Sequence, residues 1–291
     1  MPDQSVSDLI DLVRAELATP VDPRAAAMAA AIAAQYSGSA RAVLFYGSCL
    51  RESELDGLML DFYLIVSDYS DAYPKRWMAA ANSLIPPNVF PFQSGGLIAK
   101  YAVLSEADFD RLNGAETRNV SVWARFAQPS RLVWAVDDTA RDRAVAAVAR
   151  AAPTLLAAAG RVDGEAPLDW WRRAFSLTYS VELRAERTNR AQSVVDADAE
   201  RYARFSLPAI AAISADARGG GWARRRLEGK ALSIARLAKA SLTYAGGIDY
   251  LAWKINRHAG TKIEIKPWQR RWPLVAALTL VLRLMKSGAI R

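Results

Sequence analysis

The sequence predicts an α/β fold, with a sheet and its helices in the first half of the chain and a mainly helical second half. Short apolar runs rich in β-branched and aromatic residues recur as far as residue 136, and longer segments with helical spacing follow. With 291 residues, 52% of them apolar and 23% charged, the chain can bury an ample core. We expect two domains, residues 1–150 and residues 151–291.

Two helices are predicted ahead of the first strand. Residues 7–17 place apolar side chains on one face, and Ser7 is a candidate N-cap. Asp22 and Pro23 then open an Ala-rich helix that is expected to stop near Gly38. Acidic residues precede the first basic residue, so the N-terminus resembles neither a secretory signal nor a mitochondrial presequence.

Four strands are predicted, at residues 43–46, 58–66, 95–104 and 131–136. Between the second and third strands we expect a short helix at 77–84, which Pro86 and Pro87 terminate. Ser105 has the spacing of a helix start after the third strand. In the second half, helices are predicted at 169–186 and 232–244, with a glycine linker at 219–221 between them.

The chemistry is concentrated in the first two strands and the loop between them. Gly47 and Ser48 follow the first strand, where a glycine lets the backbone approach a ligand and N–H groups can hold phosphate oxygens. Asp61 lies inside the second apolar run, where an ionised carboxylate needs a partner, solvent or a cation. The single cysteine, Cys49, excludes an internal disulfide and is interpreted as a packing residue.

A Gly-Ser loop followed by an acid on the next strand resembles the nucleotidyltransferase superfamily that includes polymerase β. The motif Y-G-S followed by M-L-D-F is more closely similar to the mitochondrial translocator assembly and maintenance family of CDP-diacylglycerol synthases. I-A-K-Y-A-V-L-S and A-R-F-A-Q-P follow in the same order, at residues 98–105 and 124–129. The resemblance covers residues 43–136 and implies a nucleotidyltransferase-like mixed sheet.

The resemblance also implies a set of site residues. Its catalytic candidates are Asp61, Lys100 and Arg125, and its nucleotide-binding candidates are Gly47, Ser48, Tyr179 and Arg184. Each also has an ordinary structural explanation, such as an edge-strand lysine, a surface arginine or a helix-packing tyrosine. Asn82 and Asn88 lie where family asparagines are expected, and Trp77 matches only part of a family Trp-His pair.

Mg²⁺ is the cofactor that the resemblance implies, with Asp61 as one ligand. The superfamily places a second acid two residues away, but Met59 and Tyr63 occupy those positions. We favour Asp56 as the second metal ligand; the alternatives are Glu52, Glu54, Asp68 and Asp137.

The basic residues gather at the C-terminal end. Residues 222–291 hold 15 Lys and Arg against three acids, a local net charge of +12 in a chain of net charge +8. Such asymmetry favours a surface that meets phosphates, of a membrane or of nucleic acid. The apolar run 274–282 is about half the length that spans a bilayer, and Trp268 and Trp272 precede it. It either enters an anionic membrane interface or docks on the protein's own core.

The function that the resemblance implies is transfer of CMP from CTP to phosphatidic acid, a step of phospholipid biosynthesis that gives CDP-diacylglycerol and pyrophosphate. The expected partners are CTP, phosphatidic acid and an anionic membrane surface rather than nucleic acid. The expected location is cytoplasmic, peripheral on the inner face of a bacterial membrane. Two alternatives remain: the same chemistry on another phospholipid or a phosphosugar, and an inactive nucleotidyltransferase fold that serves as a binding protein.

Overall fold

The computed structural model describes residues 2–52, 54–181, 194–214, 217, 219–243 and 266. Within these ranges the fold is α/β, with one mixed sheet of five strands in the order β3-β4-β2-β1-β5. The strands are β1 (Ala40–Tyr46), β2 (Met59–Val66), β3 (Asn88–Ser94), β4 (Leu97–Ser105) and β5 (Ser130–Ala135). β2 and β4 run parallel, and the other neighbouring pairs are antiparallel. The predicted fold class is therefore confirmed at the level of an α/β mixed sheet with helices.

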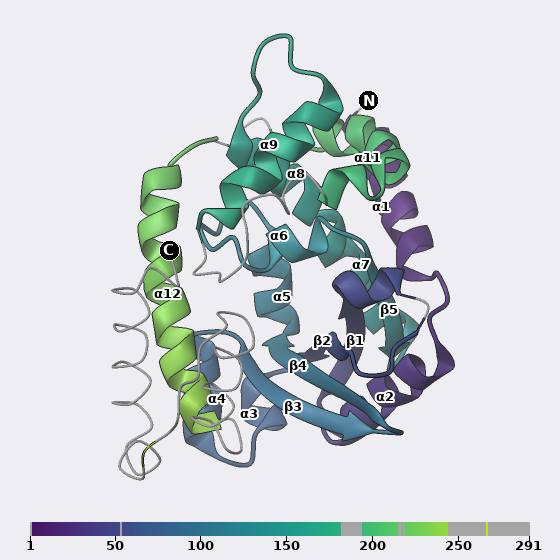
Figure 1. The fold of residues 1–291 in the computed structure, drawn as a ribbon, viewed down its shortest axis with the longest axis vertical. Helices are drawn as coiled ribbons and strands as arrows, with labels where there is room; N and C mark the ends of the chain where they lie inside the picture. Colours follow the sequence, from purple (N-terminus) through teal and green to yellow (C-terminus); the bar gives the residue numbers. More distant parts are fainter. Residues whose placement is uncertain are drawn as a thin grey trace.

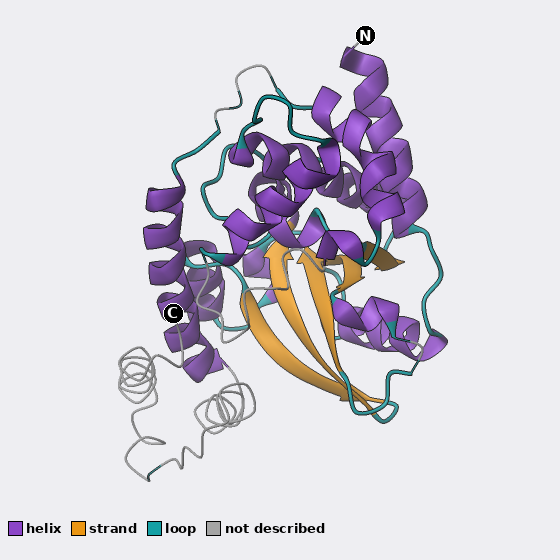
Figure 2. Ribbon diagram, turned by 45° about the horizontal axis from the view of Figure 1, so that its top comes forward, coloured by secondary structure: helices purple, strands orange, loops and turns teal. Residues whose placement is uncertain are grey.

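The helices surround the sheet and extend well beyond it (Figure 1). They are α1 (Pro2–Leu17), α2 (Pro23–Ala34), α3 (Tyr69–Ala72), α4 (Arg76–Leu84), α5 (Glu106–Asn113), α6 (Trp123–Phe126), α7 (Asp138–Ala149), α8 (Ala151–Ala159), α9 (Pro167–Tyr179), α11 (Ala199–Ala211) and α12 (Trp222–Thr243). A short 3-10 turn, η1 (Ser48–Arg51), follows β1 directly. Most of the helices gather on one side of the sheet (Figure 2).

Alternation along β2 divides the buried residues between the two faces of the sheet. Leu60, Phe62 and Leu64 join the core that α2 covers. Tyr63 and Ile65 point to the opposite face and join the core formed with the other helical layer. Because side chains alternate along a strand, Asp61 belongs to the face of Tyr63 and Ile65.

Three helix starts follow the sequence signals closely. The carboxylate of Asp22 accepts a hydrogen bond from the N–H of Arg24, and Ser105 accepts one from the N–H of Asp108 at the start of α5. Asp137, which follows β5, caps α7 in the same way. Each side chain satisfies an N–H group that the first helical turn leaves without a partner. The predictions for the starts of α2 and α5 are confirmed.

The third predicted strand differs in the structure. β3 and β4 form a hairpin whose turn contains Gly95 and Gly96, both with positive φ. The sequence prediction missed β3, because Pro91 in its middle lacks the N–H that pairs strands. The proline is tolerated because β3 lies at the edge of the sheet. Lys100 therefore lies on an interior strand, between β2 and β3, rather than at the edge.

Two helix boundaries also required correction. α1 begins at Pro2, so Ser7 lies inside the helix and is not its N-cap. α12 begins at Trp222, ten residues before the predicted start and directly after the glycines at 219–221. The predicted domain boundary at residue 150 falls between α7 and α8, and the helices after it share one hydrophobic core with α1 and the sheet.

Basic side chains hold α12 against the rest of the protein. Arg225 donates to the carbonyls of Thr117 and Arg118, near the start of the helix. Near its C-terminal end, Arg236 donates to the carbonyl of Pro86, and Lys239 donates to those of Ile85 and Pro87 (2.9 Å for Pro87). α12 therefore links the loop before α6 to the loop after α4.

Among the described residues, no helix is long and apolar enough to cross a bilayer. The predicted interfacial segment at 274–282 lies outside the described residues.

Candidate functional site

The Gly-Ser loop and the strand aspartate meet at one end of the interior strands β1 and β2. Tyr46, the last residue of β1, is paired with Asp61 of β2. Gly47 then adopts φ 97° and ψ −170°, a conformation that is essentially restricted to glycine. A Cβ on Gly47 would lie 3.4 Å from Oδ2 of Asp61. The loop backbone thus passes directly over the carboxylate of Asp61.

The turn after Gly47 leaves a polar surface open. Ser48 is exposed and begins η1. The first N–H groups of a helical turn have no carbonyl partner within the turn. Ser48 is therefore available to an external ligand beside Asp61. This arrangement suits an oxygen-rich anion such as a phosphate.

Lys100 completes the cluster from the neighbouring strand. Asp61 and Lys100 are register partners across the parallel pair of β2 and β4, so their side chains point to the same face. Nζ of Lys100 lies 2.9 Å from Oδ1 of Asp61. Both side chains are partly exposed, Lys100 by 30% and Asp61 by 23%. Oδ1 itself is buried, and no group in the described part of the chain donates to it with good hydrogen-bond geometry.

The pKa of the Cys49 thiol is affected by the charges around this turn. Burial raises its pKa, the negative charges of Asp61 and Glu52 raise it further, and the positive charge of Lys100 opposes them. Sγ donates to the carbonyl of Met59 and takes part in the apolar core, as expected of a packing residue. The negative charge of Glu52, which directly follows η1, therefore acts on the same thiol as the charge of Asp61.

Asp56, the second acid favoured from sequence, is engaged elsewhere. Its carboxylate lies 2.9 Å from Nη1 of Arg24, and its side chain is 59% exposed. Arg24 belongs to α2, which covers the face of the sheet opposite to Asp61. Of the other acids considered, Asp68 caps α3 and Asp137 caps α7. In the described chain no group of three or more metal-binding side chains is assembled.

α6 brings Arg125 to the face of the sheet that carries Asp61. Phe126 packs its ring 5.2 Å from that of Tyr63 and 6.1 Å from that of Tyr46. Arg125, the preceding residue, is half-buried and donates from Nη1 to the carbonyl of Ser121. α6 therefore packs on this face through Phe126, and the guanidinium of Arg125 is bound to the loop before α6.

The remaining predicted residues lie away from this cluster or outside the described chain. Tyr179, the last residue of α9, is half-buried and packs against the helical core. Arg184 lies outside the described residues. Asn82 is fully buried: it donates to the carbonyl of Val103 at 2.9 Å and accepts from the N–H of Asn88. These two asparagines join α4 to the sheet.

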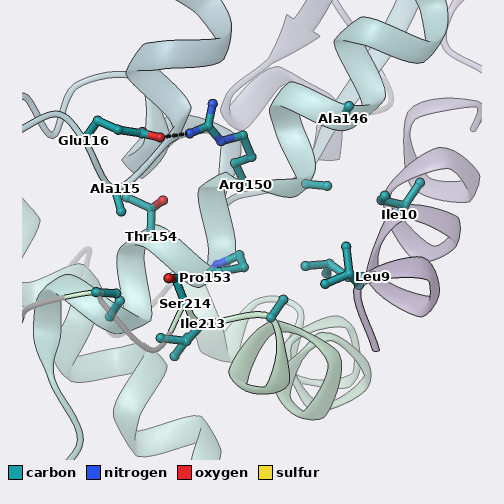
Figure 3. Close-up of a pocket in the computed structure, with 15 residues that line it drawn as sticks. Leu9, Ile10, Ala115, Glu116, Ala146, Arg150, Pro153, Thr154, Ile213 and Ser214 are labelled. Atoms are coloured by element: carbon teal, nitrogen blue, oxygen red, sulfur yellow. Dashed lines mark hydrogen bonds and ion pairs between the residues drawn. The ribbon is translucent and has the colours of Figure 1, made fainter. Parts of the chain in front are cut away.

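A cavity of about 240 Å³ opens between α1, α7, α8 and the residues after α11 (Figure 3). Its walls are mainly apolar, with Leu9 and Ile10 on one side and Pro153 on another, and Arg150 reaches across its edge to Glu116. It contains none of the predicted site residues. The candidate site is therefore the open cluster of Gly47, Ser48, Asp61 and Lys100 rather than this cavity.

A scan of protein-family models and a search of curated protein sequences found no match to this chain.

Proposed function

We propose that this protein is a phosphatidate cytidylyltransferase, which transfers CMP from CTP to phosphatidic acid. One observation carries the proposal: the glycine turn of Gly47 and Ser48, the carboxylate of Asp61 and the ammonium of Lys100 meet at one end of the interior strands. Phosphoryl-type transfer depends on positioning and charge neutralisation more than on a protein nucleophile. A phosphate-binding turn, an acid and a cation are the parts that this chemistry uses.

In the proposed reaction, a phosphate oxygen of phosphatidic acid attacks the α-phosphorus of CTP. The bond from that phosphorus to the bridging oxygen breaks, and pyrophosphate leaves. The N–H groups at the turn of Ser48 would hold the β and γ phosphates, and Lys100 would offset charge that develops on the phosphates. Arg125 would contribute positive charge from α6.

The donor set is compatible with Mg²⁺ as the cofactor. Mg²⁺ usually binds to proteins through one or two carboxylates, with substrate phosphates and water completing its shell. Asp61 offers one carboxylate, whose buried Oδ1 has only the Lys100 ammonium beside it among described groups. Glu52 is the better candidate for a second, since it shares the turn of Cys49 while Asp56 is paired with Arg24. When bound, the ion would withdraw charge from the phosphate oxygens.

The membrane is the proposed source of the acceptor, which makes the protein a peripheral membrane protein. The basic C-terminal residues support this proposal through their attraction to anionic lipid.

Pyrophosphate release tests the proposal. The purified protein is incubated with Mg²⁺, phosphatidic acid vesicles and each of the four ribonucleoside triphosphates in turn. We expect release with CTP and phosphatidic acid together, and CDP-diacylglycerol in the lipid extract. Asp61→Asn, which keeps the shape of the side chain and removes its charge, should lower the rate on the order of a hundredfold or more. Release with another acceptor would support the same chemistry on a different substrate, and no release with any nucleotide would favour an inactive binding protein.

A further inference from the structure

The outer face of α4 presents large apolar side chains to solvent. Trp77 is 47% exposed and Leu84 is 80% exposed. The two residues are seven positions apart, which places them on the same side of the helix two turns apart, with exposed Ala80 between them. The opposite side of α4 carries partly buried Met78 and fully buried Asn82. This helix is thus apolar on the side that faces away from the protein as well as on the side that packs.

Two cations border the same face. Lys75 and Arg76 precede Trp77 directly, and both are exposed. Across the described residues, neither takes part in an ion pair or a side-chain hydrogen bond, and α4 contains no acid. We call Lys75, Arg76, Trp77, Ala80 and Leu84 the α4 face. It combines apolar side chains at its centre with uncompensated positive charge at its border.

We propose that the α4 face is a contact site for the surface of an anionic phospholipid bilayer. Tryptophan is enriched at membrane interfaces, where its ring lies at the depth of the headgroups, and lysine and arginine attract anionic lipid. A nine-residue helix is about 13 Å long, so α4 suits a position parallel to the bilayer plane. Its charge complements an anionic surface, whereas a second copy of this face would bring like charges together.

α4 lies beside the C-terminal end of α12. The loop after α4 receives Arg236 and Lys239 of α12, so α4 and the C-terminal end of α12 lie on one side of the molecule (Figure 1). The inference rests on the proposed function in one respect, that a phospholipid acceptor must be reached from a bilayer. The contact itself requires no catalysis.

A fluorophore on the α4 face tests the contact directly. In Leu84→Cys, a thiol-reactive, polarity-sensitive fluorophore would attach at position 84, because the native Cys49 is buried. Leu207→Cys is the matched control: Leu207 is 75% exposed, lies on α11 and belongs to a different side of the molecule. The probes are vesicles of phosphatidylcholine alone and vesicles of phosphatidylcholine with phosphatidylglycerol.

We expect the emission at position 84 to shift to shorter wavelength only with the phosphatidylglycerol vesicles, and the emission at position 207 to stay unchanged. Two results would overturn the inference. Emission at position 84 that stays aqueous while the protein sediments with vesicles would assign binding to another surface. A short-wavelength emission before vesicles are added would show that another part of this chain, or a second copy, covers α4; light scattering then separates these two.

Charge variants provide a second measurement on the full chain. Lys75→Gln and Arg76→Gln should each weaken vesicle affinity about fivefold at low salt, the effect expected for one cation near an anionic surface. Raised salt should remove most of this difference. Unchanged affinity in the double variant would contradict the proposal. The two proposals can fail separately, because phosphatidylglycerol is not the proposed acceptor. Binding to phosphatidylglycerol vesicles, with no pyrophosphate release from CTP and phosphatidic acid, would refute the enzyme and leave the contact standing. Pyrophosphate release without binding through α4 would refute the contact and leave the enzyme standing.

Discussion

At the scale of single residues, the candidate site depends on the backbone of Gly47 and Ser48 and on the charges of Asp61 and Lys100. Gly47 adopts a conformation closed to other residues, and the pairing of β1 with β2 places Asp61 directly beside it. The parallel register of β2 and β4 then brings Lys100 to Asp61. Each of these residues has a well-defined geometric task, so conservative substitutions should separate folding from function.

Gly47→Ala should harm both stability and nucleotide binding. A side chain at φ 97° should cost about 1–3 kcal/mol of unfolding free energy, and the added Cβ would contact the Asp61 carboxylate. Gly38→Ala is the control, because Gly38 also has a positive φ, 92°, but nothing lies within 4 Å of its added Cβ. Urea unfolding should show a loss in both variants. Calorimetric CTP binding should weaken only in Gly47→Ala, and equal binding in the two would contradict the assignment of the turn.

Glu52→Gln and Asp56→Asn should distinguish the two candidates for a second metal ligand. Glu52 is coupled to the turn that contains Cys49, and Asp56 is paired with Arg24. We expect Glu52→Gln to raise the Mg²⁺ concentration for half-maximal turnover by about tenfold, by analogy with other losses around metal sites. Asp56→Asn should leave it unchanged. The reverse pattern, measured by magnesium titration of pyrophosphate release, would restore Asp56 as the ligand.

At the scale of elements, α12 is attached mainly through cations that donate to backbone carbonyls. Arg225 binds the loop before α6, and Arg236 and Lys239 bind the loop after α4. Lys239 is only 8% exposed. Burial, assisted by the charge of Arg236, lowers the pKa of Lys239 from 10.5 to about 7. A buried amine with this pKa makes the attachment of α12 dependent on pH.

The sign of this dependence follows from proton binding. The unfolded chain holds the Lys239 proton up to pH 10.5, whereas the folded protein releases it near pH 7. Between these values the unfolded state binds more protons, so stability should rise with pH from about 7 toward 10.5. Below pH 7 the Lys239 amine is charged in the folded protein, and its burial lowers the unfolding free energy by the full amount. Urea midpoints compared between the wild type and Lys239→Met should diverge across this range, with the flatter curve in the variant. Parallel curves would show that Lys239 is not the titrating group.

At the scale of the whole molecule, a buried ion pair joins α1, the first helix, to α11. Arg201 of α11 is 3% exposed and binds Glu16 of α1 through both Nε and Nη2, with 2.9 Å for the latter. Its Nη1 donates to the carbonyl of Ala127, and its guanidinium lies 4.3 Å from the ring centre of Phe205. Burial alone lowers the pKa of Arg201, but Glu16 outweighs it and the pKa is raised. The pair joins residues 185 positions apart.

Arg201→Met should lower the unfolding free energy by about 3–5 kcal/mol, because it leaves the Glu16 carboxylate buried without its partner. Arg14→Met is the matched control, since the Arg14 and Asp142 pair also involves α1 but is exposed. We expect that change to have a much smaller effect on the unfolding free energy, because water and salt screen an exposed ion pair. Adding Glu16→Gln to Arg201→Met should recover part of the loss, and a double-mutant cycle measures the coupling. Similar losses in the two single variants would mean that burial of the pair has little effect.

Local signals in the sequence determined much of the architecture. The α/β class, β1, β2, β5 and the starts of α2 and α5 were predictable, because apolar periodicity and capping side chains act over a few residues. Gly47, Ser48, Asp61 and Lys100 were identifiable from the order of their motifs. β3 was not, since Pro91 interrupts it and only its edge position makes the proline acceptable.

Which charges meet depends on how the strands and helices pack. Lys100 pairs with Asp61 because β2 and β4 are parallel neighbours, a relation that neither strand encodes by itself. Asp56 pairs with Arg24 because the loop returns to α2, and Arg201 reaches Glu16 because α11 packs on α1. Periodicity specifies which face of an element is apolar, but ion pairs between distant elements depend on how the whole core closes. For that reason the members of the candidate site could be read from the sequence, whereas their ion-pair partners depend on the packed fold.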